Sequence, residues 1–305
     1  MVSMNIYTGM AGIQRIICIF FVVLAMALPV GAEDLDTVLQ SGTLQHLGIP
    51  YANFITPDRQ GLDVDLMHAF ADYLGVRYKF IESTWSTIIP DLTGKKIKVE
   101  GDNVSITGRT KKKGNVIATG FTVLPWREKI VSFSQETFPS GIWLISRNDS
   151  RLTPIKPTGD IHNDIAMVKK ELAGVSVLGL QGSCLAPSLY GIDKTGAQLR
   201  FFPPGNDLEE MIPSVIAHNA DATLIDVPVA QVALTRWPGK IKVIGPVSPP
   251  QKMACAFARD SPKLKAKFDV FFHQFKKSGQ YRKLVEKYYP SVFTYYPNFA
   301  GQERP

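Results

Sequence analysis

The sequence predicts an α/β fold in which parallel sheets are covered by helices, and it predicts this arrangement twice along the chain. The first observation is a strand, helix, strand order over residues 43–81. The second is a similar alternation that begins after Pro139 and continues to Ile225. Alternation of this kind favours parallel sheets with helical layers. A chain of 305 residues is also long enough for two domains.

In the first half, residues 43–49 and 76–81 are expected strands, and residues 64–74 are an amphipathic helix ended by Gly75. Apolar residues recur in this helix at spacings of three and four, so one stripe should pack on the sheet. They are Leu66, Met67, Phe70 and Leu74.

Residues 94–115 do not follow this alternation of strand and helix. Apolar and polar residues alternate on both sides of Gly101, Asp102 and Asn103, which is a hairpin signal, and the lysines at 111–113 indicate a solvated segment. We expect a basic hairpin insertion at 95–113, followed by a strand at 116–118. Because the insertion precedes that strand, it should emerge at the end opposite the ligand, since ligands of open α/β sheets sit at the carboxyl ends of strands.

The second half alternates in the same way and ends in helix. Strands are expected at 142–145, 175–180 and 222–225, and helices at 161–172 and 208–218. A long amphipathic helix at 262–289 should be interrupted near Ser278 and Gly279.

The amino terminus predicts export. Arg15 precedes an apolar run of thirteen residues, 16–28, and small residues at 30–32 offer a cleavage site. The run is shorter than the roughly 20 residues that span a bilayer. We therefore expect a signal peptide at 1–32; an uncleaved anchor helix is the alternative.

Charge and cysteine content narrow the function classes. The net charge is +7, but there is no basic stripe interleaved with aromatic residues, so nucleic acid is not an expected partner. Five scattered histidines lack ligand spacing, and no metal site or cofactor is expected. Cys184 and Cys255 remain after processing, and we predict two free thiols.

Seven segments occur in a recognisable order and spacing: GLDVDL at 61–66, WSTIIPDL at 85–92, GFTVLPWR at 120–127, VSFS at 131–134, LGLQGS at 178–183, ADATLID at 220–226 and SGQYRKL at 278–284. Together they resemble the bacterial extracellular solute-binding protein family 3, the periplasmic amino-acid receptors of ABC importers. The resemblance covers nearly the whole mature chain.

The resemblance implies a type II two-lobed periplasmic-binding-protein fold with two hinge strands. Lobe 1 would comprise 33–137 and 253–305, and lobe 2 would comprise 141–250. The family also implies a monomeric periplasmic protein that captures a small carboxylate, most simply an amino acid, and delivers it to a membrane permease of an ABC transporter.

Four residues are expected to hold the ligand's backbone. Arg127 can grip a carboxylate through two parallel N–H bonds, and Gly120 permits close backbone approach. The family uses the positions matching Gly120, Thr122 and Arg127 for the α-carboxylate, and the one matching Asp226 for the α-ammonium. The alternatives are a solvated Arg127 paired with Glu128, and an Asp226 that only caps a helix.

The resemblance implies three further contacts. Tyr51 and Trp85 match aromatic positions that sandwich the ligand side chain, although as bare sequence either could be core packing. Ser183 follows a strand of the second half, so it is a candidate carboxylate donor from the opposite lobe. Gly48 stands where basic-amino-acid receptors carry an acid, and Leu124 and Leu180 replace polar residues, so we infer a neutral ligand side chain.

Two other functions remain open. The basic hairpin suits a non-transport sensor or accessory protein that contacts a partner. The same fold also resembles periplasmic cyclohexadienyl dehydratases, in which an acid in the cleft protonates a leaving hydroxyl. Glu209 and Glu210 are acids of the second half, but their pattern indicates an exposed helix face, so we expect no enzyme activity.

Overall fold

The computed structural model describes residues 34–296 and 299, with the exception of 101, 182 and 204–209. The predicted signal peptide at 1–32 and Glu209 therefore lie outside the described residues. Within those residues, no helix has both the length and the apolar character needed to cross a bilayer.

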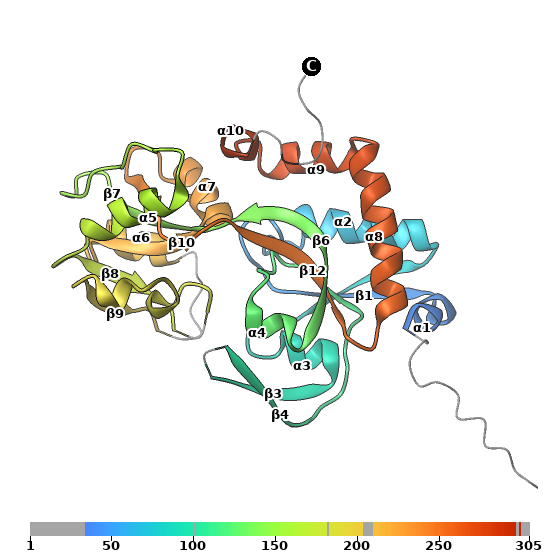
Figure 1. The fold of residues 1–305 in the computed structure, drawn as a ribbon. Coiled ribbons are helices and arrows are strands. Elements are labelled where there is room, and N and C mark those ends of the chain that lie inside the picture. The colour runs from blue at the N-terminus through green and yellow to red at the C-terminus, as the bar shows by residue number, and fades with distance from the viewer. Residues whose placement is uncertain (1–33, 101, 182, 204–209, 297–298, 300–305) are drawn as a thin grey trace, which may run out of the picture. The chain divides into compact units, whose positions relative to one another are not determined.

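The first sheet has the strand order β2-β1-β5-β12-β6 (Figure 1). Its strands are β1 (Thr43–Gly48), β2 (Arg77–Glu82), β5 (Val116–Ile117), β6 (Val131–Ser140) and β12 (Gln251–Ala258). Strand β1 is parallel to β2 and β5, whereas β12 is antiparallel to β5 and β6. The sheet thus combines strands from both ends of the chain.

The second sheet has the order β11-β7-β10-β8-β9. Its strands are β7 (Ile142–Arg147), β8 (Ser176–Gly179), β9 (Gln198–Phe201), β10 (Ala222–Asp226) and β11 (Ile241–Pro246). Strands β8, β9 and β10 run parallel, and β7 is antiparallel to β10 and β11. The α/β class and the two-lobed type II fold expected from the sequence are confirmed.

The helices follow the predicted alternation. They are α1 (Asp34–Ser41), α2 (Leu62–Leu74), α3 (Ile88–Thr93), α4 (Pro125–Glu128), α5 (Ile161–Lys170), α6 (Met211–Ile216), α7 (Val227–Arg236), α8 (Pro262–Lys277), α9 (Gln280–Tyr288) and α10 (Val292–Tyr295), with 3-10 turns at Pro187–Tyr190 and Ile192–Lys194. Helix α2 ends at Gly75, whose φ of 70° suits a left-handed cap, and the break between α8 and α9 falls at Ser278 and Gly279 as expected.

Strands β6 and β12 connect the two sheets. Strand β6 leads through Gly141 directly into β7, and the chain returns from β11 to the first sheet in β12. At the crossing the two strands pair with each other, Ser140 opposite Gln251 and Pro139 opposite Lys252. The lobe boundaries near these residues stay a prediction.

The predicted hairpin forms a separate two-stranded sheet of β3 (Lys95–Glu100) and β4 (Asn103–Arg109) beside α3 (Figure 1). Its base lies at the amino end of β5, as expected. The tip of the hairpin, however, lies beside α4, the helix that carries Arg127, and so does not point away from the predicted ligand site. The Lys129 Nζ, next to α4, donates to the Asp102 carbonyl at 2.7 Å. A hairpin that starts at the amino end of a strand can run back along the sheet, and this one does so.

Candidate functional site

Arg127 is a buried cation in the short helix α4. Only 7% of the residue is exposed, and its guanidinium carbon lies 4.0 Å from the centroid of the Phe121 ring. Its Nη1 donates to the Thr122 carbonyl at 2.9 Å, whereas Nε has no hydrogen-bond partner. Burial lowers the pKa of Arg127 to about 10, which leaves it charged at neutral pH. The alternative of a solvated Arg127 is therefore wrong.

Gly120 shapes the backbone that precedes α4. Its φ of 56° lies in the left-handed region, and a Cβ there would stand 2.4 Å from the Phe54 ring. Its N–H donates to the Asp63 Oδ2 at 2.6 Å, so this amide is already occupied. Gly120 is required for the turn, and the sequence reasoning had missed Asp63 as the residue that holds it.

Two buried side chains fix residues 118–120. Burial raises the pKa of Asp63 to about 7, against the effect of the Gly120 hydrogen bond. His46 lies within hydrogen-bond distance of the Ala118 carbonyl (2.6 Å) and the Tyr78 hydroxyl (2.8 Å), and burial lowers its pKa to about 4. An uncharged His46 thus positions this backbone at neutral pH.

Cys184, which follows β8, lies close to Thr122 and Arg127. Burial raises the pKa of its thiol, although the Arg127 guanidinium and the Thr122 hydroxyl oppose the shift. The Tyr190 hydroxyl donates to the Cys184 carbonyl at 2.5 Å, and the Gln251 amide donates to that hydroxyl at 3.2 Å. The connection between β8 and β9 therefore contacts the Arg127 region, and it is also bonded to β12 of the first sheet. Family spacing alone gave no signal for Cys184 or Tyr190.

Asp226 is the second buried charge. It ends β10 and caps α7, because its Oδ1 accepts the Val229 N–H at 3.1 Å. The residue is 1% exposed, and its Oδ2 has no partner. Burial raises its pKa to about 7, although the Val229 hydrogen bond acts in the opposite direction. The capping role is real, but it uses only one of the two oxygens.

The two aromatic candidates, Tyr51 and Trp85, differ in how far their side chains are exposed to solvent. Tyr51 is buried, with its ring stacked on Phe54 at 6.1 Å and meeting Trp85 edge-on at 5.5 Å. Trp85 is 41% exposed. Tyr51 is therefore part of the core, and Trp85 offers the accessible ring. The sandwich of a ligand between them stays a prediction.

Ser183 is committed to a local turn. Its Oγ donates to the Leu180 carbonyl at 2.9 Å and accepts the Leu185 N–H at 3.0 Å. A hydroxyl has one hydrogen. Donation to a ligand carboxylate would require the bond to Leu180 to break.

Gly48 has a packing explanation. A Cβ at this position would lie 2.4 Å from the Ile55 Cδ1 and 2.6 Å from the Phe80 ring. An acidic side chain has no room here, so its absence follows from the neighbouring core. Among the residues that the structure describes, no cluster of His, Cys, Asp or Glu could hold a metal ion.

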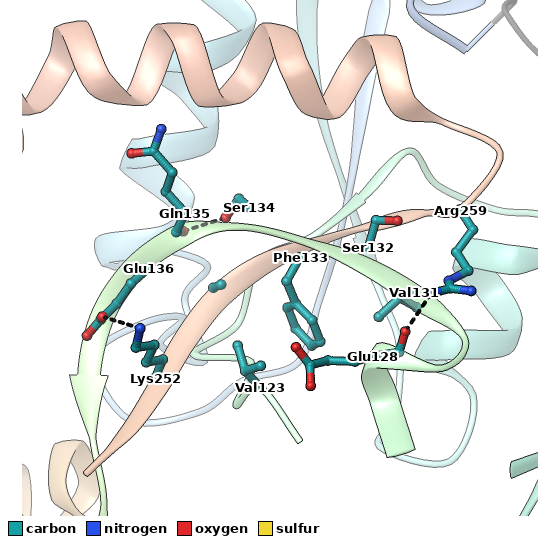
Figure 2. A pocket seen from close by; sticks show the side chains of 11 residues that line it. Val123, Glu128, Val131, Ser132, Phe133, Ser134, Gln135, Glu136, Lys252 and Arg259 are labelled. Carbon is teal, nitrogen blue, oxygen red and sulfur yellow. Dashed lines mark hydrogen bonds and ion pairs between the residues drawn. The ribbon is translucent and has the colours of Figure 1, made fainter. Parts of the chain in front are cut away.

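A cavity of about 570 Å³ lies between the connecting strands and α4 (Figure 2). None of the seven predicted ligand residues lines it. Its lining residues are Val123, Glu128, Val131, Ser132, Phe133, Ser134, Gln135, Glu136, Lys252, Ala254 and Arg259. Phe133 stacks on Phe121 at 5.8 Å, and Phe121 in turn supports Arg127. The cavity therefore borders the Arg127 region without containing it.

Comparison with known proteins identifies the family. The model of the bacterial extracellular solute-binding proteins, family 3, matches residues 49–115 and 103–291. These two matches cover most of the chain and include all seven predicted ligand residues.

Two relatives have quite different names. The membrane-bound lytic murein transglycosylase F of Desulfosudis oleivorans is 24% identical over 236 residues, which are 77% of this chain and 45% of that protein. The chain thus spans less than half of its length. The octopine-binding periplasmic protein of Rhizobium meliloti is 23% identical over 232 residues, 71% of this chain and 72% of that protein.

Solved structures share the fold. A mutant of ArgBP from T. maritima superposes with a TM-score of 0.64 at 23% identity, covering 84% of this chain and 99% of that one. The ancestral amino acid-binding protein AncCDT-1, a precursor of cyclohexadienyl dehydratase, gives 0.62 at 25% identity, covering 84% and 98%.

Proposed function

The chain belongs to family 3 of the bacterial extracellular solute-binding proteins, and from that premise we propose that it is a periplasmic receptor that captures an amino acid or a similar small carboxylate for an ABC importer. One observation supports this most strongly: two buried groups of opposite charge, Arg127 and Asp226, each keep a polar atom without a partner.

Arg127 suits a carboxylate. A buried charge without a counter-ion is costly, and the structure gives this guanidinium a carbonyl and an aromatic ring but no ion pair within the described residues. A ligand carboxylate would supply the missing charge with the fork geometry that arginine prefers.

Asp226 suits an ammonium group. Its unpartnered Oδ2 can accept a charge-assisted hydrogen bond while Oδ1 continues to cap α7. An α-amino acid carries both complementary charges. In the proposed division into lobes, Gly120, Thr122 and Arg127 belong to one lobe, and Asp226 and Ser183 belong to the other.

Ligand binding would then favour the closed state, because a ligand shifts a conformational equilibrium only when it binds one state better than the other. Contacts from both lobes satisfy that condition. For the ligand side chain we propose a neutral group that packs on Trp85, since the packed site at Gly48 admits no acid to match a basic ligand.

Native mass spectrometry of freshly purified protein tests the proposal directly. We expect a bound mass that matches a small carboxylate and that disappears in Arg127→Ala. The matched control is Arg59→Ala, because Arg59 is 63% exposed in a surface ion pair with Glu82. Calorimetry with the identified compound should show binding to the control and none to Arg127→Ala. Equal binding by both variants would overturn the proposal.

A second candidate rests on the raised pKa of Asp226. A carboxylic acid with a pKa of about 7 is partly protonated at neutral pH and can act as a general acid. That property would suit a dehydratase, in which an acid protonates a leaving hydroxyl. Incubation with prephenate or arogenate and detection of a decarboxylated aromatic product would distinguish the enzyme from the receptor.

A further inference from the structure

The positive charge of the chain is concentrated in one segment. Residues 95–113 contain seven lysines and arginines and two acidic residues, a net charge of +5, while the whole 305-residue chain carries +7. The rest of the protein is therefore close to neutral. Because most of the net positive charge lies in residues 95–113, anions should be attracted to this segment and not to the protein surface as a whole.

Three cations of this segment form ion pairs with described residues, and four do not. Lys98 pairs with Glu100 at 2.7 Å, Lys112 with Asp260 at 3.2 Å, and Lys113 with Asp91 at 2.9 Å. The other four cations form no ion pair with any carboxylate among the described residues. They are Lys95, Lys96, Arg109 and Lys111.

The register adds a second observation. Lys95 lies directly opposite Arg109 at the base of the hairpin. Like charges in directly opposed positions destabilise a sheet, so this pair does not serve the stability of the free hairpin. An external anion that lies across both side chains would remove the repulsion.

Apolar side chains are exposed on the same hairpin. Ile97 lies opposite Ile106, and Val99 lies opposite Val104. Ile97 packs against the protein core, but Ile106 is 57% exposed and Val99 is 39% exposed. The hairpin thus offers unpaired cations at its base and branched aliphatic side chains farther along its strands.

We propose that this hairpin, β3 and β4 with residues 110–113, adsorbs to an anionic lipid surface. The cations are spread along a solvent-exposed segment of nineteen residues, so they fit a flat, extended array of anionic headgroups. Stable attachment to a bilayer takes two signals, such as a basic patch together with apolar insertion. Here the exposed valine and isoleucine supply the second one. This interaction is independent of the ligand proposed above.

Sedimentation with vesicles tests the proposal on the purified secreted protein. We compare vesicles of phosphatidylglycerol and phosphatidylcholine with vesicles of phosphatidylcholine alone, at 20 and 300 mM salt. Binding should appear with the anionic vesicles only and should fall at least tenfold at the higher salt, because screening shortens the reach of exposed charges.

Two sets of variants have equal changes in net charge. The test variant replaces four hairpin cations by glutamine and should lose at least tenfold in partitioning; it carries Lys95→Gln, Lys96→Gln, Arg109→Gln and Lys111→Gln. The control replaces four exposed lysines outside the hairpin and should bind as the parent does; it carries Lys156→Gln, Lys170→Gln, Lys194→Gln and Lys240→Gln.

An apolar pair of variants tests the second signal. Ile106→Ser should weaken partitioning severalfold, whereas Leu189→Ser, at a site 51% exposed in the second half, should not. Thermal unfolding of each variant verifies that it is folded. The proposal fails if the two charge variants lose binding equally, if neutral vesicles bind as well as anionic ones, or if polyglutamate binds the protein while the vesicles do not.

Discussion

Arg127 and Asp226, the two buried charged residues of the candidate site, differ in how much their side chains contribute to the fold. Arg127 belongs to a one-turn helix and is held by one hydrogen bond to the Thr122 carbonyl and by the Phe121 ring. Asp226 caps a ten-residue helix through Oδ1 and keeps only Oδ2 uncommitted. Changing Arg127 should therefore cost little structural stability, whereas Asp226 combines its capping role with the proposed ligand contact.

The largest expected effect is on Arg127. Arg127→Ala should abolish carboxylate binding, because the loss of one partner leaves the ligand anion partly buried and unpaired, at a cost of about 3–5 kcal/mol. Folding should survive, since the side chain makes one hydrogen bond to the protein. Calorimetry and thermal unfolding measure the two effects. Affinity unchanged within about threefold would place the carboxylate elsewhere.

Asp226→Asn should separate the two roles of the aspartate. The amide oxygen can still cap α7, while the lost charge should weaken ligand binding by about tenfold to a hundredfold, as expected for a hydrogen bond to a charged group. Asp226→Ala removes the cap as well and should also destabilise the protein by about 1 kcal/mol. If Asn and Ala give equal stability, the cap contributes nothing.

The raised pKa of Asp226 predicts a pH effect on stability. Between about pH 4 and pH 7 the folded protein keeps a proton that the unfolded chain has lost, so the free energy of unfolding should fall as pH rises through this window. Asp63 acts in the same direction. In urea titrations at pH 5 and pH 8, Asp226→Asn should reduce this decline without removing it. An unchanged decline would mean that Asp226 ionises normally.

Ligand binding should release protons for the same reason. An ammonium group favours the ionised carboxylate, so binding at pH 6 should release up to about one proton and affinity should rise with pH up to about 7. Calorimetry in buffers of different ionisation enthalpy measures the released proton. Asp226→Asn is the control, and release that persists in this variant would assign the proton to another group.

The smallest expected effect concerns the hairpin. Replacing residues 95–113 by a short Gly-Ser turn should change ligand affinity by less than about threefold, because the hydrogen bond that joins the hairpin to the α4 region comes from Lys129 and does not involve Arg127. A loss beyond tenfold, about 1.4 kcal/mol, would show that the hairpin positions Arg127.

Much of the fold could be predicted because local signals and the global fold agree. Gly75 and Gly279 end helices where the periodicity breaks, and both adopt positive φ. The hairpin strands were predicted from alternation, but the direction of the tip depends on a contact between Asp102 and Lys129, which no local pattern encodes.

The candidate site was predictable only in part. Asp226 stands out as an acid at the end of an apolar strand, whereas Arg127 is indicated by the family resemblance, because its local sequence alone favours a solvated residue beside Glu128. Asp63 does not, because its role depends on a backbone amide 57 residues away in the chain. Ser183 stays a predicted ligand contact, but its hydroxyl is used by its own turn, and the sequence pattern does not reveal that competing bond.

Cys184 and Cys255 are both free, as expected, and they differ in access. Cys255 is 1% exposed inside β12, and burial holds the pKa of its thiol well above the usual range. Cys184 is partly exposed and lies beside Arg127. Between these two thiols, a maleimide fluorophore added to the native protein should therefore react faster with Cys184 than with Cys255. Cys184 would then be a natural attachment point for an optical sensor of ligand binding at the proposed Arg127 site.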